Sequence, residues 1–387
     1  MPDGSDAAAP LAIRYDAALL DLDGVVYSGD LAVPGAAEAL GQVRRLGMAR
    51  VFVTNNASRT PAAVVEHLER LNVPARPLDV VTSAQAAAAR LEALLAPGAR
   101  VLVVGGEGLV HAVCDAGFEP VRSAQDDPRA VVQGFSPDLT WQLLMEACVA
   151  VRAGLPWIAT NVDATLPTPR GEGPGNGAMV DVVRRVTRRD PDAVAGKPFA
   201  PIMEEACRRV RSTRPLVVGD RLDTDIEAAQ AAGMDSLLVL TGVTGVRELL
   251  TCPAGRRPTY VGPDLTALLS PGHRAEKESA GEDDVSEHGA APDGSRWRCG
   301  VASVRLEQAP DGTFTLDVRL DGASSIPSRS DVPPATAADV VHAAAAACWA
   351  VVDGRTDADG GSAVPEALVA ELVLALSPWA ARLGWDR

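Results

Sequence analysis

Two aspartates stand one residue apart in the segment DLDGVVYSGD, which covers residues 21–30. The run before them, residues 17–20, reads AALL and predicts a buried strand. Carboxylates this close repel each other and lose hydration when buried, so something must offset them. Asp21 and Asp23 therefore indicate a chemical site at a strand end, with Gly24 at a sharp turn. A plain turn after a strand is the alternative.

Three further polar segments follow predicted strands: VTNNASR at 53–59, AGKPFAP at 195–201 and GDRLDTD at 219–225. The carboxyl ends of parallel strands meet at one crevice, where ligands bind. Carboxylate oxygens suit Mg²⁺, and a metal together with a lysine offsets the charge of a phosphate. This crevice would hold Asp21, Asp23, Thr54, Asn55, Asn56, Lys197, Asp220, Asp223 and Asp225.

Each of these segments also has a purely structural interpretation. TNNASR could be an Asx-rich loop before a helix at Thr60, and Lys197 an ordinary loop lysine. Asp223 and Asp225 would begin a helix, where the dipole favours acids. We take that interpretation for Asp223, whereas the ordered set favours one shared site for the other positions. Lysine occurs only at 197 and 277, so its presence in the second of these segments needs a reason.

Short β-rich runs alternate with helical stretches from Ile13 to about Leu269, which is typical of a parallel α/β sheet. We predict a Rossmann-like, doubly wound core formed by residues 13–83 and 179–270, with an α/β domain inserted at 84–178. Within the insert, GGEGLV at 105–110 suggests either a dinucleotide loop or, the interpretation we prefer, a turn into a helix.

The two ends of the chain are expected to lie outside this core. Residues 1–12 are predicted to be a disordered tail, and the polar segment 271–295 a linker. Residues 296–387 are predicted to form a small α+β accessory module. It would contain a hairpin around a Pro-Asp-Gly turn and two helices, near 336–352 and 364–377.

Composition narrows the class of partner. The formal net charge is −15 and the isoelectric point about 4.8, which argues against nucleic acid or an anionic membrane. The six cysteines are scattered without a CxxC pair, which is typical of a reducing compartment. The N-terminus lacks the features of a signal peptide, and no apolar run has the length of a membrane span. We therefore expect a cytoplasmic protein.

The ordered set of four segments resembles the haloacid dehalogenase superfamily of phosphohydrolases over about residues 13–269. The resemblance is strongest to the branch with a type-IIA cap, which includes NagD-like, 4-nitrophenyl-phosphate, phosphoglycolate and glycerol-3-phosphate phosphatases. In that family the insert is a cap that closes over the phosphate site. Residues 296–387 lie outside the resemblance.

The resemblance implies a role for each matching position. Asp21 matches the nucleophile that forms an aspartyl-phosphate, and Asp23 the general acid and base. Thr54, Asn55 and Lys197 match the phosphate-binding residues. The residues implied to hold Mg²⁺ are Asp21, Asp23 through its backbone carbonyl, Asp220 and Asp225.

The function implied is Mg²⁺-dependent hydrolysis of a small phosphorylated metabolite, with glycerol 3-phosphate and 2-phosphoglycolate favoured. Contacts to the leaving group are expected from Asn56, Arg59, Asn161, Asp163 and Arg170. A phosphosugar mutase or phosphonatase on the same scaffold, and a non-catalytic regulatory binding protein, remain as alternatives. A homodimer, if one forms, is expected to use the cap or the C-terminal module.

Overall fold

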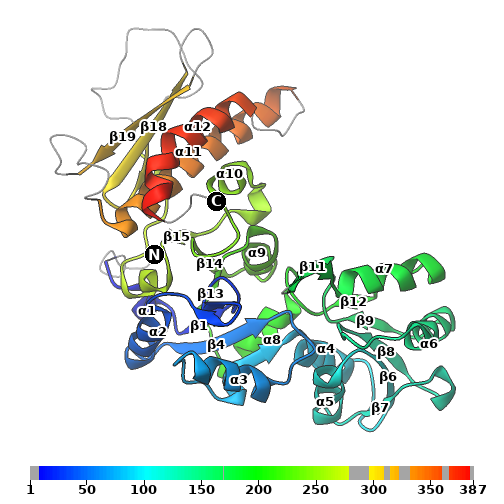
Figure 1. Ribbon diagram of the computed structural model, residues 1–387. Coiled ribbons are helices and arrows are strands. Elements are labelled where there is room, and N and C mark those ends of the chain that lie inside the picture. The colour runs from blue at the N-terminus through cyan, green and yellow to red at the C-terminus, as the bar shows by residue number, and fades with distance from the viewer. Residues whose placement is uncertain are drawn as a thin grey trace.

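The computed structural model describes residues 8–168, 170–278, 296–308, 314–321, 332–359 and 366–383. Its central sheet has six parallel strands in the order β15-β14-β13-β1-β4-β5 (Figure 1). Helices cover both faces of such a sheet, which is why all four residues of β1 are apolar and buried. The predicted doubly wound core is confirmed. Its strands are β1 (Ala17–Leu20), β4 (Ala49–Thr54), β5 (Val80–Thr82), β13 (Pro215–Gly219), β14 (Asp235–Val239) and β15 (Tyr260–Gly262).

The helices of the core begin and end where local chemistry places them. Helix α3 (Pro61–Arg70) has proline at its first position, and the Thr60 hydroxyl accepts a hydrogen bond from Ala63 N. The other helices are α1 (Leu11–Arg14), α2 (Ala36–Arg45), α4 (Ser83–Glu92), α8 (Pro201–Val210), α9 (Glu227–Ala231) and α10 (Val246–Thr251). The hairpin of β2 (Tyr27–Ser28) and β3 (Leu31–Ala32) follows directly after DLDG.

The insert forms a second parallel sheet, in the order β12-β9-β8-β6-β7. Its strands are β6 (Arg100–Val104), β7 (Glu119–Val121), β8 (Ala130–Gln133), β9 (Trp157–Ala159) and β12 (Ala193–Val194). Its helices are α5 (Glu107–Asp115), α6 (Trp141–Arg152) and α7 (Asn176–Thr187), and a hairpin of β10 (Thr165–Thr168) and β11 (Gly171–Pro174) is attached. We call this unit, residues 100–194, the cap.

Both expected boundaries of the insert, 83/84 and 178/179, need correction. Helix α4, which covers residues 83–92, packs against β5 and α8 and belongs to the core. Helix α7 packs against α6 of the cap, and β12 pairs in parallel with β9. The apolar face of α7 is therefore buried inside the insert, and the core resumes only near Ala195. Lys197 consequently lies three residues beyond the last strand of the cap, where the two domains meet.

The N-terminal expectation is also wrong for its last residues. Leu11 and Ala12, which we placed in a disordered tail, are buried in α1, and Leu11 N donates a hydrogen bond to Ser270 O. Burial of the apolar Leu11 side chain against the end of the core explains why these residues are ordered. Residues 1–7 of the expected tail lie outside the described residues.

The C-terminal residues form an antiparallel sheet covered by two helices (Figure 1). The sheet contains β16 (Glu276–Lys277), β17 (Arg296–Cys299), β18 (Ala302–Gln308) and β19 (Phe314–Leu320), and the helices are α11 (Pro334–Asp359) and α12 (Glu366–Arg382). The predicted hairpin is present as β18 and β19, although its turn, 309–313, lies outside the described residues. Part of the expected linker is strand β16, and residues 279–295 are not described.

The C-terminal module shares one hydrophobic core with the core domain, so it is not merely tethered. Leu222, Leu249 and Leu250 of the core domain pack in the same cluster as Ala344 and Leu372 of α11 and α12. The Trp349 indole also donates a hydrogen bond of 3.0 Å to Leu249 O. These shared apolar contacts make the C-terminal module an integral part of the fold.

Among the described residues, no helix combines the length and the apolar character needed to cross a membrane.

His342 makes the shared core sensitive to acid. It is buried on α11, and burial lowers its pKa from 6.5 to about 4. Between about pH 6.5 and 4 the unfolded chain therefore binds a proton that the folded chain does not, so stability is lost as pH falls through this window. We expect His342→Gln to reduce the loss of unfolding free energy between pH 7 and 4.5 by roughly 2–3 kcal/mol, measured by urea denaturation.

His273 gives a control of opposite sign. Its hydrogen bond to Asp339 raises its pKa, so its contribution is present at low pH and is lost as pH rises through the folded value. His273→Gln should therefore steepen the loss of stability in acid rather than relieve it. Identical pH profiles for the wild-type protein and the His342 variant would contradict this account.

Candidate active site

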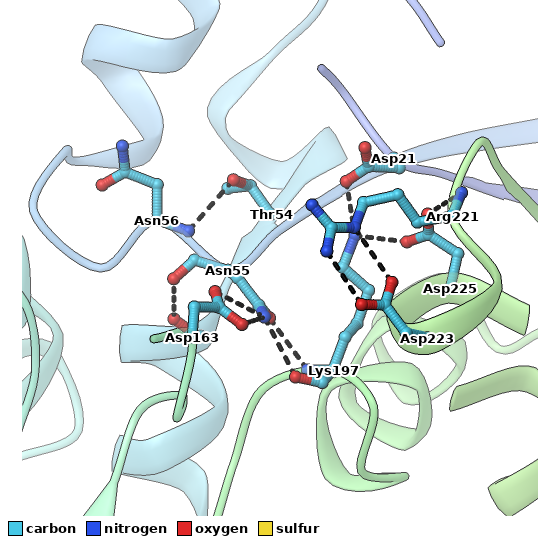
Figure 2. Close-up of polar contacts among 10 residues, drawn as sticks. Asp21, Thr54, Asn55, Asn56, Asp163, Lys197, Arg221, Asp223 and Asp225 are labelled. Atoms are coloured by element: carbon cyan, nitrogen blue, oxygen red, sulfur yellow. Dashed lines mark hydrogen bonds and ion pairs between the residues drawn. The ribbon is translucent and has the colours of Figure 1, made fainter. Parts of the chain in front are cut away.

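Lys197 lies between two carboxylates at the carboxyl ends of the core strands (Figure 2). Asp21 directly follows β1, and its backbone N–H donates to Val218 O, which continues the sheet by one residue. The Lys197 ammonium, 3% exposed as a residue, donates to Asp21 Oδ1 and, at 2.6 Å, to Asp225 Oδ1. The lysine therefore holds the Asp21 carboxylate in one orientation facing the crevice.

Asp220 completes an acidic cluster with more negative than positive charge. One oxygen from each of Asp21, Asp220 and Asp225 lies within 4.8 Å of the others. Burial, followed by repulsion from the other two carboxylates, raises the pKa of Asp220 to about 8. Burial likewise raises the pKa of Asp225 to about 6, although Lys197 opposes it. One ammonium group does not neutralise three carboxylates.

The Asp220 carboxylate has one oxygen available to a divalent cation. Asp220 Oδ2 accepts a hydrogen bond of 2.7 Å from Val243 N, whereas the buried Oδ1 has no hydrogen-bond partner among the described residues. Both oxygens of Asp225 are engaged, by the Lys197 ammonium and by Arg221 N. Hard oxygen donors with a deficit of positive charge are the environment that Mg²⁺ prefers. Asp220 and Asp21 are thus the best-placed carboxylate ligands.

Two glycines allow Asp220 to lie in this position. A Cβ atom added at either Gly24 or Gly242 would collide with the Asp220 carboxylate, and Gly24 also has φ +81°. Thr241 Oγ1 donates to Gly24 O at 2.5 Å, which joins the two glycine turns. Sequence reasoning missed the turn at 241–244, although the motif LTG after an apolar strand was a usable signal.

Asp23 is exposed, two residues beyond Asp21. Its backbone follows the turn in which Gly24 N donates to Tyr27 O, and its Oδ1 lies 3.5 Å from Gly29 N in the β2–β3 hairpin. The side chain therefore leaves the cluster that holds Lys197. A carboxyl group in this position has access to solvent and to a leaving group that enters the crevice.

The side-chain amide of Asn55, which is expected to bind phosphate, is instead engaged by other residues of the protein. Asn55 Oδ1 accepts from Lys197 N at 2.8 Å, and Nδ2 donates to Lys197 O at 3.0 Å. Nδ2 also donates to the Asp163 carboxylate at 3.1 Å. The side chain brackets the backbone of Lys197 and connects it to the cap (Figure 2).

The cap reaches this bracket through residues that we expected at the leaving group. Asn161 is buried, and its Nδ2 donates to Asn55 O at 2.8 Å. Asp163 N in turn donates to Asn161 Oδ1, and burial raises the pKa of Asp163. Asn161 and Asp163 therefore fasten the cap to the core beside Lys197.

The other three expected specificity residues are exposed. Asn56 Oδ1 accepts from Ser58 N at 2.9 Å, so this side chain closes the Asx turn that was the structural alternative. Arg59 follows in the same loop, and Arg170 lies between β10 and β11 of the cap hairpin. Their contacts to a leaving group stay predictions, as does phosphate binding by Thr54, whose hydroxyl accepts from Asn56 N.

Two other features near the site have structural explanations. Gly108 of GGEGLV lies in the first turn of α5, and a Cβ atom there would lie 2.6 Å from Ala57 O, so the glycine lets the cap helix approach the core loop. The preferred turn into a helix is therefore what this motif forms. Asp223 makes a two-bond ion pair with Arg221, at 3.0 and 2.9 Å. Arg221, next to the cluster, was not among the expected site residues.

Removal of the Asn55 side chain should misplace Lys197. We expect Asn55→Ala to lower kcat about 10–100-fold, the usual effect of losing a group that orients a charged residue. Substrate affinity should change less, because the lysine ammonium remains. Steady-state phosphate release measures both, and a variant in which only KM rises would instead place the Asn55 side chain on the substrate.

Comparison with known proteins agrees with this geometry. The family described as haloacid dehalogenase-like hydrolase matches residues 18–119, and a related family of HAD-like hydrolases matches 194–268. The D-glycerol 3-phosphate phosphatase of Mycobacterium tuberculosis is 52% identical over 258 residues, 67% of this chain and 72% of that protein. An acid sugar phosphatase of Staphylococcus aureus is 36% identical over 259 residues, 66% of this chain and 98% of that protein.

Solved structures extend the likeness to the C-terminal module. A glycerol phosphate phosphatase from Mycobacterium tuberculosis, in complex with magnesium, superposes with a TM-score of 0.72 and 41% identity, over 88% of this chain and 92% of that one. Residues 1–295 are only about three quarters of the chain, so this match includes part of the C-terminal module. The p-nitrophenyl phosphatase of Archaeoglobus fulgidus has a TM-score of 0.60 and 30% identity over 66% of this chain and 98% of that one. The chain belongs to the haloacid dehalogenase-like hydrolases, in the branch that carries a NagD-like type-IIA cap.

Proposed function

We propose that this protein is a Mg²⁺-dependent phosphatase that hydrolyses glycerol 3-phosphate through a phosphorylated Asp21. The observation that carries the proposal is the Asp21 carboxylate held by buried Lys197 beside Asp220, whose Oδ1 has no hydrogen-bond partner among the residues that the structure describes. Two named relatives support the substrate and the metal: a D-glycerol 3-phosphate phosphatase at 52% identity, and a glycerol phosphate phosphatase solved with magnesium.

The first chemical step belongs to Asp21 and Asp23. An oxygen of Asp21 attacks phosphorus, the ester P–O bond breaks, and the carboxyl group of Asp23 gives its proton to the departing glycerol oxygen. Lys197 keeps Asp21 oriented and offsets the negative charge of the phosphoryl oxygens. The Thr54 hydroxyl would donate to one of those oxygens.

The second step returns both residues to their starting states. Asp23, now a carboxylate, takes a proton from water as that water attacks phosphorus. The bond between phosphorus and Asp21 breaks and inorganic phosphate leaves. Asp23 is exposed, which gives it the access to water that this step requires.

The residues that would hold the magnesium ion are Asp21, Asp220 and the backbone carbonyl of Asp23, with Asp225 in the same cluster. The ion would supply positive charge against the phosphoryl oxygens and offset the carboxylate repulsion. Asp225, engaged by Lys197 and Arg221 N, mainly orients the lysine.

The experiment that tests the proposal is phosphate release from a panel of substrates. We expect the highest kcat/KM for glycerol 3-phosphate, with 2-phosphoglycolate, sugar phosphates and 4-nitrophenyl phosphate as competitors in the panel. EDTA should abolish phosphate release by removing the metal ion. It should also lower the melting temperature of protein that was loaded with metal, because the carboxylate cluster then loses its counter-charge. Excess Mg²⁺ should restore both.

The outcomes separate the alternatives. Interconversion of phosphosugars without phosphate release would indicate a mutase, and binding of phosphorylated ligands without turnover would indicate a regulatory protein. A preference for 2-phosphoglycolate would leave the chemistry intact and change only the substrate.

Two further expectations stay predictions. A cytoplasmic location is supported by the six free thiols, none of which forms a disulfide. A homodimer through the cap or the C-terminal module would show as a doubled mass in light scattering.

A further inference from the structure

A cavity of about 250 Å³ lies at the edge of the core sheet opposite the catalytic cluster. It is lined by the end of α2, the start of β4, the loop after α3 and the end of α8. Strand β4 runs from Ala49 at this cavity to Thr54 at the catalytic crevice. The two sites are therefore separated by the length of the strand, about 16 Å.

Arg50 is a buried charge in this cavity that forms no ion pair with any described residue, although the Asp79 carboxylate in the same lining attracts it. It is 9% exposed, and its guanidinium donates only to backbone carbonyls, to Pro74 O at 3.1 Å and to Leu40 O at 3.5 Å. No carboxylate of the described residues lies within ion-pair distance of it. Burial and the nearby charge of Arg44 lower the pKa of Arg50. A buried charge that is left unpaired is costly, and an anion in the cavity would remove that cost.

The rest of the lining leaves the cavity positively charged. Arg44 lines it from the last turn of α2 and forms no ion pair with any described residue. Arg76 lines it from the opposite loop and is paired with Asp79 at 2.7 Å. The lining thus contains three arginines, of which Arg44 and Arg76 are exposed, and one aspartate, in a chain whose formal net charge is −15. The lining therefore carries an excess of positive charge, whereas the chain as a whole is negative.

We propose that this cavity binds a small phosphoryl dianion at a site separate from the catalytic one. Guanidinium groups bind phosphoryl oxygens through paired, charge-assisted hydrogen bonds, which is why arginine is favoured at such sites. The volume accommodates inorganic phosphate or a compact phosphorylated molecule, and the apolar lining by Met48 and Val210 suits a short organic part. The proposal does not depend on the identity of the catalytic substrate.

The test is calorimetric titration of the full-length Mg²⁺-loaded protein, with inorganic phosphate in one arm and methylphosphonate in the other. The wild-type protein should show two binding events, one at each site. Arg44→Gln should weaken one event at least about tenfold, as expected for the loss of a charge-assisted hydrogen bond, and leave the other unchanged. If inorganic phosphate binds more tightly than methylphosphonate, the ligand is free phosphate. If methylphosphonate binds more tightly, the ligand is a phosphoryl group attached to an organic part.

Arg45→Gln is the matched control. Arg45 is exposed in the same last turn of α2 and does not line the cavity, so this variant loses the same charge at the same helix end. We expect both binding events to survive in it within about twofold, because an exposed charge outside the cavity contributes little. A single binding event in the wild-type protein, or equal weakening by the two substitutions, would overturn the proposal.

Discussion

Replacement of Asp21 by asparagine is expected to abolish phosphatase activity, with a loss of at least about 10⁴-fold in kcat. An amide keeps the size of the side chain and a hydrogen bond to Lys197, but it has no nucleophilic oxygen to attack phosphorus. The fold should persist, since one negative charge is removed from a cluster in which three carboxylates already repel. Phosphate release under saturating substrate measures the loss, and circular dichroism melting checks the fold.

Asp30→Asn provides the control. Asp30 is exposed and lies nine residues further along the same segment, so the change has the same chemistry without contact to the cluster. Activity of this variant should match that of the wild-type protein. If Asp21→Asn kept activity within about tenfold of the wild type while folded, Asp21 could not be the nucleophile.

Replacement of Lys197 by methionine should damage both activity and stability. Loss of one preorganised positive donor costs about 10²–10³-fold in kcat. The substitution also leaves buried Asp225 without its ammonium partner, and breaking a buried pair in this way typically costs about 3–5 kcal/mol. Urea denaturation in metal-free buffer measures the second effect, which Mg²⁺ should partly offset because it supplies positive charge to the same cluster.

Lys277→Met is the natural comparison, because Lys197 and Lys277 are the only lysines of the chain. Lys277 is exposed in β16, far along the chain from the crevice, and its replacement should change the unfolding free energy by less than about 1 kcal/mol. Equal stability of the Lys197 and Lys277 variants would mean that the buried carboxylates are neutralised by another route.

The core and the residues at its strand ends could be predicted because local patterns decide them. Apolar runs such as residues 17–20 read directly as buried parallel strands, and polar segments directly after them must meet at one edge. Asp21 and Asp225 follow the neighbouring core strands β1 and β13, so strand order brings them together, whereas Lys197 follows β12 of the cap and reaches them where the two domains meet.

The remainder depended on tertiary contacts that the local pattern does not carry. The segment of α7 reads as an amphipathic helix in either domain, and only its packing on α6 assigns it to the cap. The Asn55 amide could serve a phosphate or a backbone, and its two bonds to Lys197 decide between them. The burial of Leu11 likewise depends on the distant residue Ser270, to which its backbone N–H donates.

The integration of the C-terminal module could not be predicted for the same reason. Leu249 and Leu250 read as an ordinary buried helix face, and nothing local shows that α11 and α12 cover them. A charged linker suggested a tethered unit, whereas β16 already belongs to the C-terminal sheet. The contact between distant segments, rather than their composition, fixes this arrangement.

The most direct test of the central claim is to locate the phosphoryl group during turnover. The Asp23→Asn variant should form the intermediate from 4-nitrophenyl phosphate, whose nitrophenolate leaves without a proton from Asp23, and should hydrolyse it slowly, because the group that activates water is removed. Mixed with 4-nitrophenyl phosphate and Mg²⁺ and quenched in acid, it should yield a peptide whose added phosphoryl mass maps to Asp21. A phosphoryl group on any other residue, or turnover by the wild-type protein with no covalent adduct in either protein, would contradict the account.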